Sequence, residues 1–150
     1  MKLAKHNIQK ALIELLKDGQ QVEVPAHGMS MFPLLKPGDS LLVKPCLPNI
    51  GDISVFIKGE LLIAHRLIKI TGNTYFFKGD GLIFPDKPVE KQDVLGVVTQ
   101  RKRGKNIRST NGYTYRLFKF LMPKLTFLTG RFFYYAGRVY GRFFKIKSTT

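Results

Sequence analysis

The stretch GDISVFIKGELLIAHRLIKITGNTYFFKGD, residues 51–80, decides the fold class of this 150-residue chain. It holds three short runs rich in Ile, Leu, Val and Phe, at residues 53–57, 61–67 and 74–77, with Gly, Asn and Asp near their ends. Short apolar runs separated by turn-forming residues are typical of β-strands. We therefore expect three strands here, with no helix between them.

Similar runs lie on both sides of this stretch, at residues 22–24, 40–43 and 94–100. Six short strands without intervening helical patterns favour antiparallel pairing over alternating strands and helices. The sequence therefore predicts a mainly β fold, a coiled antiparallel sheet or barrel.

The two ends of the chain have different sequence patterns from this central part. Residues 2–18 place Leu and Ile at near-helical spacing before Gly19, which predicts an N-terminal amphipathic helix. Residues 101–112 are polar and basic and read as a linker. Residues 113–147 carry 12 of the 18 aromatics at helical steps, interrupted near Pro123. The expected division is helix 1–20, the main globular domain 21–100, a basic linker 101–112 and a basic aromatic amphipathic segment 113–150.

The charge is concentrated at the C-terminal end. Residues 101–150 contain 13 Lys or Arg and no acid, whereas residues 1–100 contain 12 Lys or Arg and 10 acids. Aromatics beside cations favour a helix lying on an anionic membrane surface. Nucleic-acid binding and packing against the core are the alternatives. The expected membrane-surface residues are Arg116, Lys119, Lys124, Arg131, Arg138 and Arg142.

Several classes of protein lack support in the sequence. There is no apolar stretch of a secretory signal and none of about 20 residues that would span a membrane. These features predict a cytoplasmic or peripheral membrane protein. No Cys/His pattern has metal-site spacing and no phosphate-binding glycine loop is present, so we expect neither metal nor cofactor.

Three clusters could carry chemistry. Ser30 lies in GMSMFPLLKPGD, residues 28–39; His65 lies in the apolar run 61–67; Asp80 and Asp86 lie in KGDGLIFPD, residues 78–86. A serine needs a base to become a nucleophile, and a neutral imidazole oriented by a carboxylate serves that purpose. Each cluster alone is ordinary, because Ser, Gly and Asp are common in turns. Their combination predicts a serine nucleophile with a histidine base.

The order of these clusters, GMSMFPLLKPGD, GDISVF, AHRLI, KGD with Asp86 six residues later, and VLGVV, resembles the successive boxes of signal peptidase I and LexA-like serine peptidases. The resemblance covers residues 24–98. It is closest to the archaeal and endoplasmic-reticulum type of signal peptidase, which has His-Arg where the ordinary bacterial enzyme has its catalytic Lys.

The resemblance implies a role for each matched residue. Ser30 is the nucleophile, His65 the general base and Asp86 the preferred third member, with Asp80 as the alternative. Gly28 stands where these peptidases usually have a Ser that binds the oxyanion, so backbone N–H groups, chiefly that of Ser30, are expected to do so. Gly28, Met29 and Met31 are the expected substrate and oxyanion residues.

The implied activity is endoproteolytic removal of leader or signal segments from precursor peptides, which dock in extended form along a sheet edge. An accessory subunit or transporter is a further candidate partner. The alternatives are a LexA-like self-cleaving regulator and a noncatalytic protein that binds nucleic acid or membranes. The first 20 residues predict only one helix, too few for a helix-turn-helix domain, so nucleic acid is not the expected partner.

Overall fold

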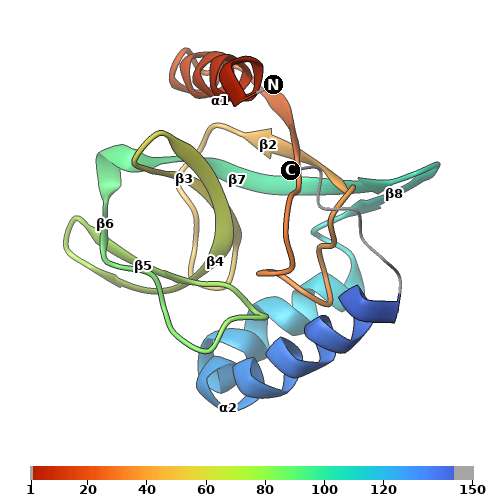
Figure 1. Cartoon of the computed structure of the whole chain (residues 1–150). Helices are drawn as coiled ribbons and strands as arrows, with labels where there is room; N and C mark the ends of the chain where they lie inside the picture. Colours follow the sequence, from red (N-terminus) through yellow and green to blue (C-terminus); the bar gives the residue numbers. More distant parts are fainter. Residues whose placement is uncertain (1, 144–150) are drawn as a thin grey trace.

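A computed structural model describes residues 2–143, which form one antiparallel sheet between two helices (Figure 1). The helices are α1, Lys2–Lys17, and α2, Tyr113–Phe143, and a short 3-10 helix spans Lys91–Asp93. The strands are β1 Val22–Pro25, β2 Ser40–Lys44, β3 Ile53–Lys58, β4 Leu61–Thr71, β5 Thr74–Lys78, β6 Val89–Glu90, β7 Val94–Arg103 and β8 Asn106–Ser109. All six predicted strands are thereby confirmed, as β1 to β5 and β7.

The sheet has the order β1-β2-β7-β3-β4-β5-β6, and β8 pairs with the outer part of β7. Among the described residues the sheet does not close on itself, so of the two expected forms the open, curved sheet is present (Figure 1). β3 lies between β7 and β4, and its first four residues are buried. This central position explains why residues 53–57 are almost entirely apolar.

The prediction of a linker at residues 101–112 is wrong. β7 continues to Arg103, the chain turns at Gly104 with a φ of 55°, and β8 pairs back with Arg101 opposite Arg108. All four residues of β8 are exposed, so backbone hydrogen bonds at a sheet edge hold it rather than burial of alternate side chains. The sheet therefore extends to Ser109, past the expected boundary at residue 100.

The N-terminal helix is confirmed as α1. Leu12, Ile13 and Leu16 pack against the main core cluster. The helix ends where Gly19 adopts a φ of 80° and its N–H donates to Leu16 O, a common way for a helix to stop. Residue 1 of the expected 1–20 helix lies outside the described residues.

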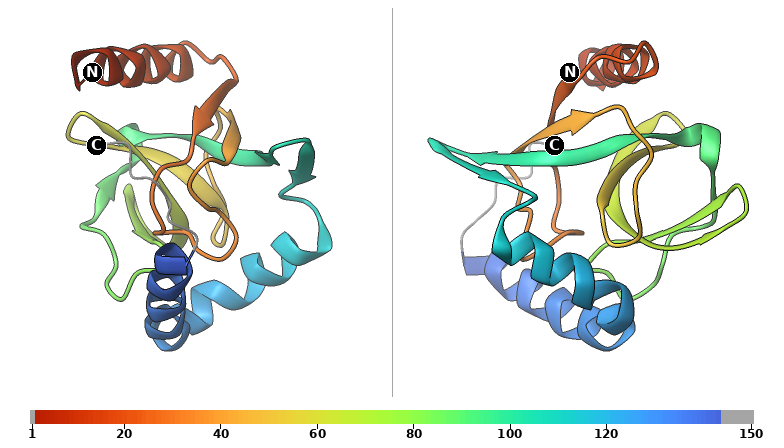
Figure 2. Two further views of the ribbon diagram at one scale, coloured as in Figure 1. Left: turned by 45° about the vertical axis from the view of Figure 1, so that its right-hand side comes forward. Right: turned by 180° about the vertical axis from the view of Figure 1, so that it is seen from behind.

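The C-terminal helix α2 continues through Pro123 and is sharply bent, so that the rings of Phe118 and Phe133 in its two halves stack 6.5 Å apart (Figure 2). It lies on the opposite side of the sheet from α1. One of its faces packs against the rest of the protein and buries Tyr115, Met122, Thr126, Gly130 and Gly137. Residues 144–150 of the expected 113–150 segment lie outside the described part. Across residues 2–143, neither helix is apolar enough over its length to cross a membrane.

Candidate active site

His65 is held rigidly in the middle of the sheet. It lies on β4 opposite Ser54 of β3, and only 6% of it is exposed. The ring of Phe56 meets the imidazole edge-on, with centroids 6.1 Å apart, and Phe56 itself stacks on Phe77. The aromatic pair and the strand together restrict the imidazole to one orientation.

Asp86 is the carboxylate that reaches His65. Its backbone N–H donates to Phe77 O at the end of β5, and its Oδ2 lies 2.5 Å from His65 Nδ1. Lys58 Nζ donates to the other oxygen, Oδ1, at 3.0 Å. Burial raises the pKa of Asp86, but the hydrogen bonds and charges of His65 and Lys58 outweigh it, so the net pKa lies below 3.8. Asp86 is therefore ionised at neutral pH and able to stabilise an imidazolium.

Asp80 occupies a different site. Its two oxygens accept hydrogen bonds from Arg66 Nε and Nη2, at 2.8 and 2.6 Å, and both side chains are buried. Arg66 also donates to Gly51 O. Of the two carboxylates that the sequence left open, Asp86 is the partner of His65, because Asp80 is fully engaged by the guanidinium of Arg66.

Ser30 lies in the loop after β1 and contacts the loop that carries both carboxylates. Its carbonyl oxygen accepts a hydrogen bond from Gly81 N at 2.8 Å. A Cβ atom at Gly79 would lie only 2.4 Å from the same oxygen, so the loop can approach Ser30 only because residue 79 is glycine. The 79–86 loop thus touches Ser30 at one end and His65 at the other.

The hydroxyl and the N–H of Ser30 are available to a substrate. Within residues 2–143, neither its Oγ nor its N–H makes a hydrogen bond, including to His65. Hydrogen bonds between a nucleophile and its base are often formed only when substrate is bound. The side chain is half-buried, so a peptide could reach it.

The residues around Ser30 divide into two kinds. Gly28 is exposed and has a φ of 89°, a conformation that favours glycine. Met29 is half-buried, and its Cε would lie 3.6 Å from a Cβ at Gly137 of α2. Met31 belongs to the main core cluster and is 3% exposed. The prediction that Met31 lies beside the substrate is therefore wrong, because its side chain packs in the core.

Two lysines at the site were not found by sequence analysis. Lys58 holds Asp86, as described above. Lys78 is fully buried, and its Nζ donates to Thr126 O and Oγ1 on α2, at 2.9 and 2.7 Å. Burial lowers the pKa of Lys78, and the charge of Asp80 opposes this shift. No pattern of neighbouring residues marks these two lysines, because their partners are distant in sequence.

The basic residues expected at a membrane surface are mostly on the outside of α2. Arg116, Lys124, Arg131, Arg138 and Arg142 are exposed. Lys119 is the exception, since its Nζ forms a salt bridge with Asp52 Oδ1 at 2.6 Å. That residue helps to attach α2 to the sheet and is not free on the surface.

The described side chains include no group of three or more His, Cys, Asp or Glu residues that could hold a metal ion. No protein-family model matches the sequence, and no curated protein matches it either.

Proposed function

We propose that the chain is a serine endopeptidase in which Ser30 is the nucleophile, His65 the general base and Asp86 the residue that orients His65. The observation that carries the proposal is the 2.5 Å contact between His65 Nδ1 and a buried, ionised Asp86, on a loop whose Gly81 N–H binds the backbone of Ser30. A carboxylate on Nδ1 leaves Nε2 to accept the serine proton.

The reaction follows from these positions. Ser30 Oγ attacks the scissile carbonyl while His65 Nε2 takes its proton, and the developing oxyanion accepts a hydrogen bond from the Ser30 N–H. Collapse of the tetrahedral intermediate breaks the C–N bond, and His65 gives the proton to the leaving amine. Water, deprotonated by His65, then hydrolyses the ester on Ser30.

The resemblance of residues 24–98 to signal peptidases and LexA-like peptidases supports a substrate class, namely leader or signal segments of precursor peptides. The curved antiparallel sheet agrees with the fold that the resemblance implies. Residues 2–21 contain a single helix, α1, whereas a helix-turn-helix DNA-binding domain needs at least two.

A surface of α2 supports action beside a membrane. Exposed apolar side chains recur along α2 at steps of three or four residues: Leu117, Leu121, Leu125, Leu128, Phe132, Tyr135, Val139 and Phe143. Lys124, Arg131 and Arg138 are exposed on the same helix. Exposed apolar and cationic side chains on one helix suit the interface of an anionic bilayer.

The test is cleavage of a panel of leader and signal peptides, with vesicles of phosphatidylcholine or phosphatidylglycerol, by the intact protein, Ser30→Ala and His65→Ala. Cleavage by the intact protein that is lost in both variants supports the proposal. Cleavage that survives in Ser30→Ala would rule out the mechanism.

Membrane binding is tested separately by vesicle sedimentation. Arg131→Gln with Arg138→Gln should weaken binding to phosphatidylglycerol vesicles, whereas the exposed control Lys44→Gln on β2 should not. If the protein bound short DNA as tightly as it binds the vesicles, and Arg131→Gln with Arg138→Gln weakened that binding too, the nucleic-acid alternative would be favoured.

A further inference from the structure

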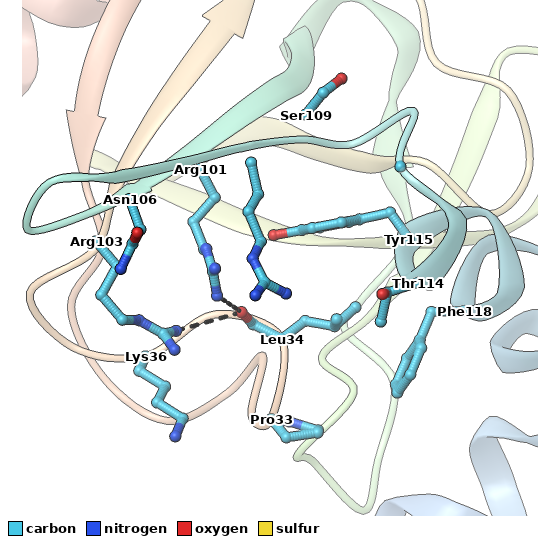
Figure 3. A pocket seen from close by; sticks show the side chains of 12 residues that line it. Pro33, Leu34, Lys36, Arg101, Arg103, Asn106, Ser109, Thr114, Tyr115 and Phe118 are labelled. Carbon is cyan, nitrogen blue, oxygen red and sulfur yellow. Dashed lines mark hydrogen bonds between the residues drawn. The ribbon is translucent and has the colours of Figure 1, made fainter.

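A pocket of about 610 Å³ lies away from the candidate active site, between the β7–β8 hairpin, residues 33–36 and the start of α2 (Figure 3). Ser30, His65 and Asp86 do not line it. Its volume is in the range of small-molecule sites. Any ligand it holds is therefore distinct from the peptide that Ser30 would cleave.

The polar lining of the pocket is strongly cationic. Lys36, Arg101, Arg103 and Arg108 all line it, and no carboxylate does. Asp39 pairs with Arg103 Nε and Nη2 at 2.6 and 2.7 Å and offsets one of these charges. The remaining positive charge favours an anion that carries more than one negative charge.

Two polar groups in the lining are buried without a partner in the described chain. They are Nε of Arg101 and the hydroxyl of Tyr115, in residues that are 8% and 5% exposed. Arg101 Nη1 is already bound to Leu34 O, and Figure 3 shows the Tyr115 ring extending from α2 toward the arginine side of the pocket. A buried donor left unpaired is unfavourable, because it has lost its hydrogen bonds to water. Burial raises the pKa of Tyr115, so its hydroxyl is protonated and able to donate at neutral pH.

The rest of the lining is apolar and comes from Pro33, Leu34 and Phe118. We propose that the pocket binds an organic phosphate, with its phosphoryl oxygens on Arg101, Arg108 and Tyr115 and its organic part against this apolar wall. A phosphoryl group supplies close to two negative charges and three strong acceptors, which the guanidinium forks match. The inference goes beyond the proposed peptidase activity and does not depend on it.

The probe is phenyl phosphate, titrated calorimetrically into the whole protein. Tyr115→Phe removes only a hydroxyl that has no partner, so the thermal midpoint should not fall, yet affinity should drop about tenfold. Arg108→Gln, on the exposed strand β8, should weaken binding at least as much. The matched control is Lys102→Gln, which removes the same charge from β7 between Arg101 and Arg103, on the opposite face of the strand.

A second arm identifies the source of the phosphate by using phosphatidylcholine vesicles with and without phosphatidic acid. Saturable binding of phenyl phosphate, weakened in Tyr115→Phe and Arg108→Gln but not in Lys102→Gln, supports a free organic phosphate. The same variant pattern with phosphatidic acid vesicles alone supports a lipid headgroup. Binding of neither probe, or equal effects of all three variants, overturns the proposal.

Discussion

Asp80 and Asp86 are six residues apart on one loop, yet they serve two different faces of the sheet. His65 and Arg66 are neighbours on β4, so their side chains project to opposite faces. Asp86 meets His65 on one face, and Asp80 meets Arg66 on the other. The loop thus brings one carboxylate to the proposed general base and the other to a buried guanidinium, and the alternation of side chains along β4 separates the two.

The largest effect that separates the two carboxylates should be on catalysis. Asp86→Asn keeps the shape of the side chain but removes the charge that orients His65 and stabilises its imidazolium. We expect the cleavage rate to fall about 10⁴-fold, as for other triads that lose their carboxylate. Steady-state kinetics on a cleaved leader peptide would measure this, and a loss of less than tenfold would contradict the assignment.

Asp80→Asn should instead act on stability. It leaves the buried guanidinium of Arg66 without its counter-ion, which typically costs about 3–5 kcal/mol. Urea unfolding of Asp80→Asn and Asp86→Asn side by side would measure the difference. If Asp86→Asn were the less stable of the two, the division of roles would be reversed.

Lys78, the last residue of β5, precedes this loop and also has a structural contact. Its ammonium group donates hydrogen bonds to Thr126 of α2. Thr126→Val removes the hydroxyl acceptor and keeps the volume, and we expect a loss of about 1.5–3 kcal/mol in the free energy of unfolding. Thr129→Val is the matched control, since its hydroxyl binds only within the helix, to Leu125 O and weakly to Met122 Sδ. Equal losses in both would show that Lys78 does not depend on α2.

The smallest expected effect is the pH dependence of stability that Asp86 contributes. Its pKa in the folded protein lies below 3.8, so its contribution is present above that pH and is lost as the pH falls through the folded pKa. The gap in unfolding free energy between the unmodified protein and Asp86→Asn should therefore narrow as the pH falls below 3.8. A gap that widens on acidification would contradict the direction of the shift.

Most of the fold was predictable because its strands carry local signals. The runs that became β1 to β5 and β7 are rich in β-branched and aromatic residues and end at turn formers. β8 was missed because its residues are all exposed, so no alternation marks it. β6 is only two residues long and has too few positions to form a pattern.

The site was predictable in part. Ser30 and His65 could be chosen by residue type and order, but spacing along a turn does not show which carboxylate faces His65. That choice depends on Arg66 engaging Asp80, a contact across β4 that only the folded chain reveals. Lys58 and Lys78 were missed for the same reason, because Asp86 and Thr126, their partners, are distant in sequence.

We propose that Ser30, His65 and Asp86 act as one unit, and comparing a double variant with its two single variants shows whether they do. Cleavage rates would be measured for Ser30→Ala, Asp86→Asn and the protein carrying both changes. Residues that act together are strongly non-additive, so we predict that the double variant is no slower than Ser30→Ala alone. A double variant slower by the product of the two single losses would contradict the account, because Asp86 would then act independently of Ser30.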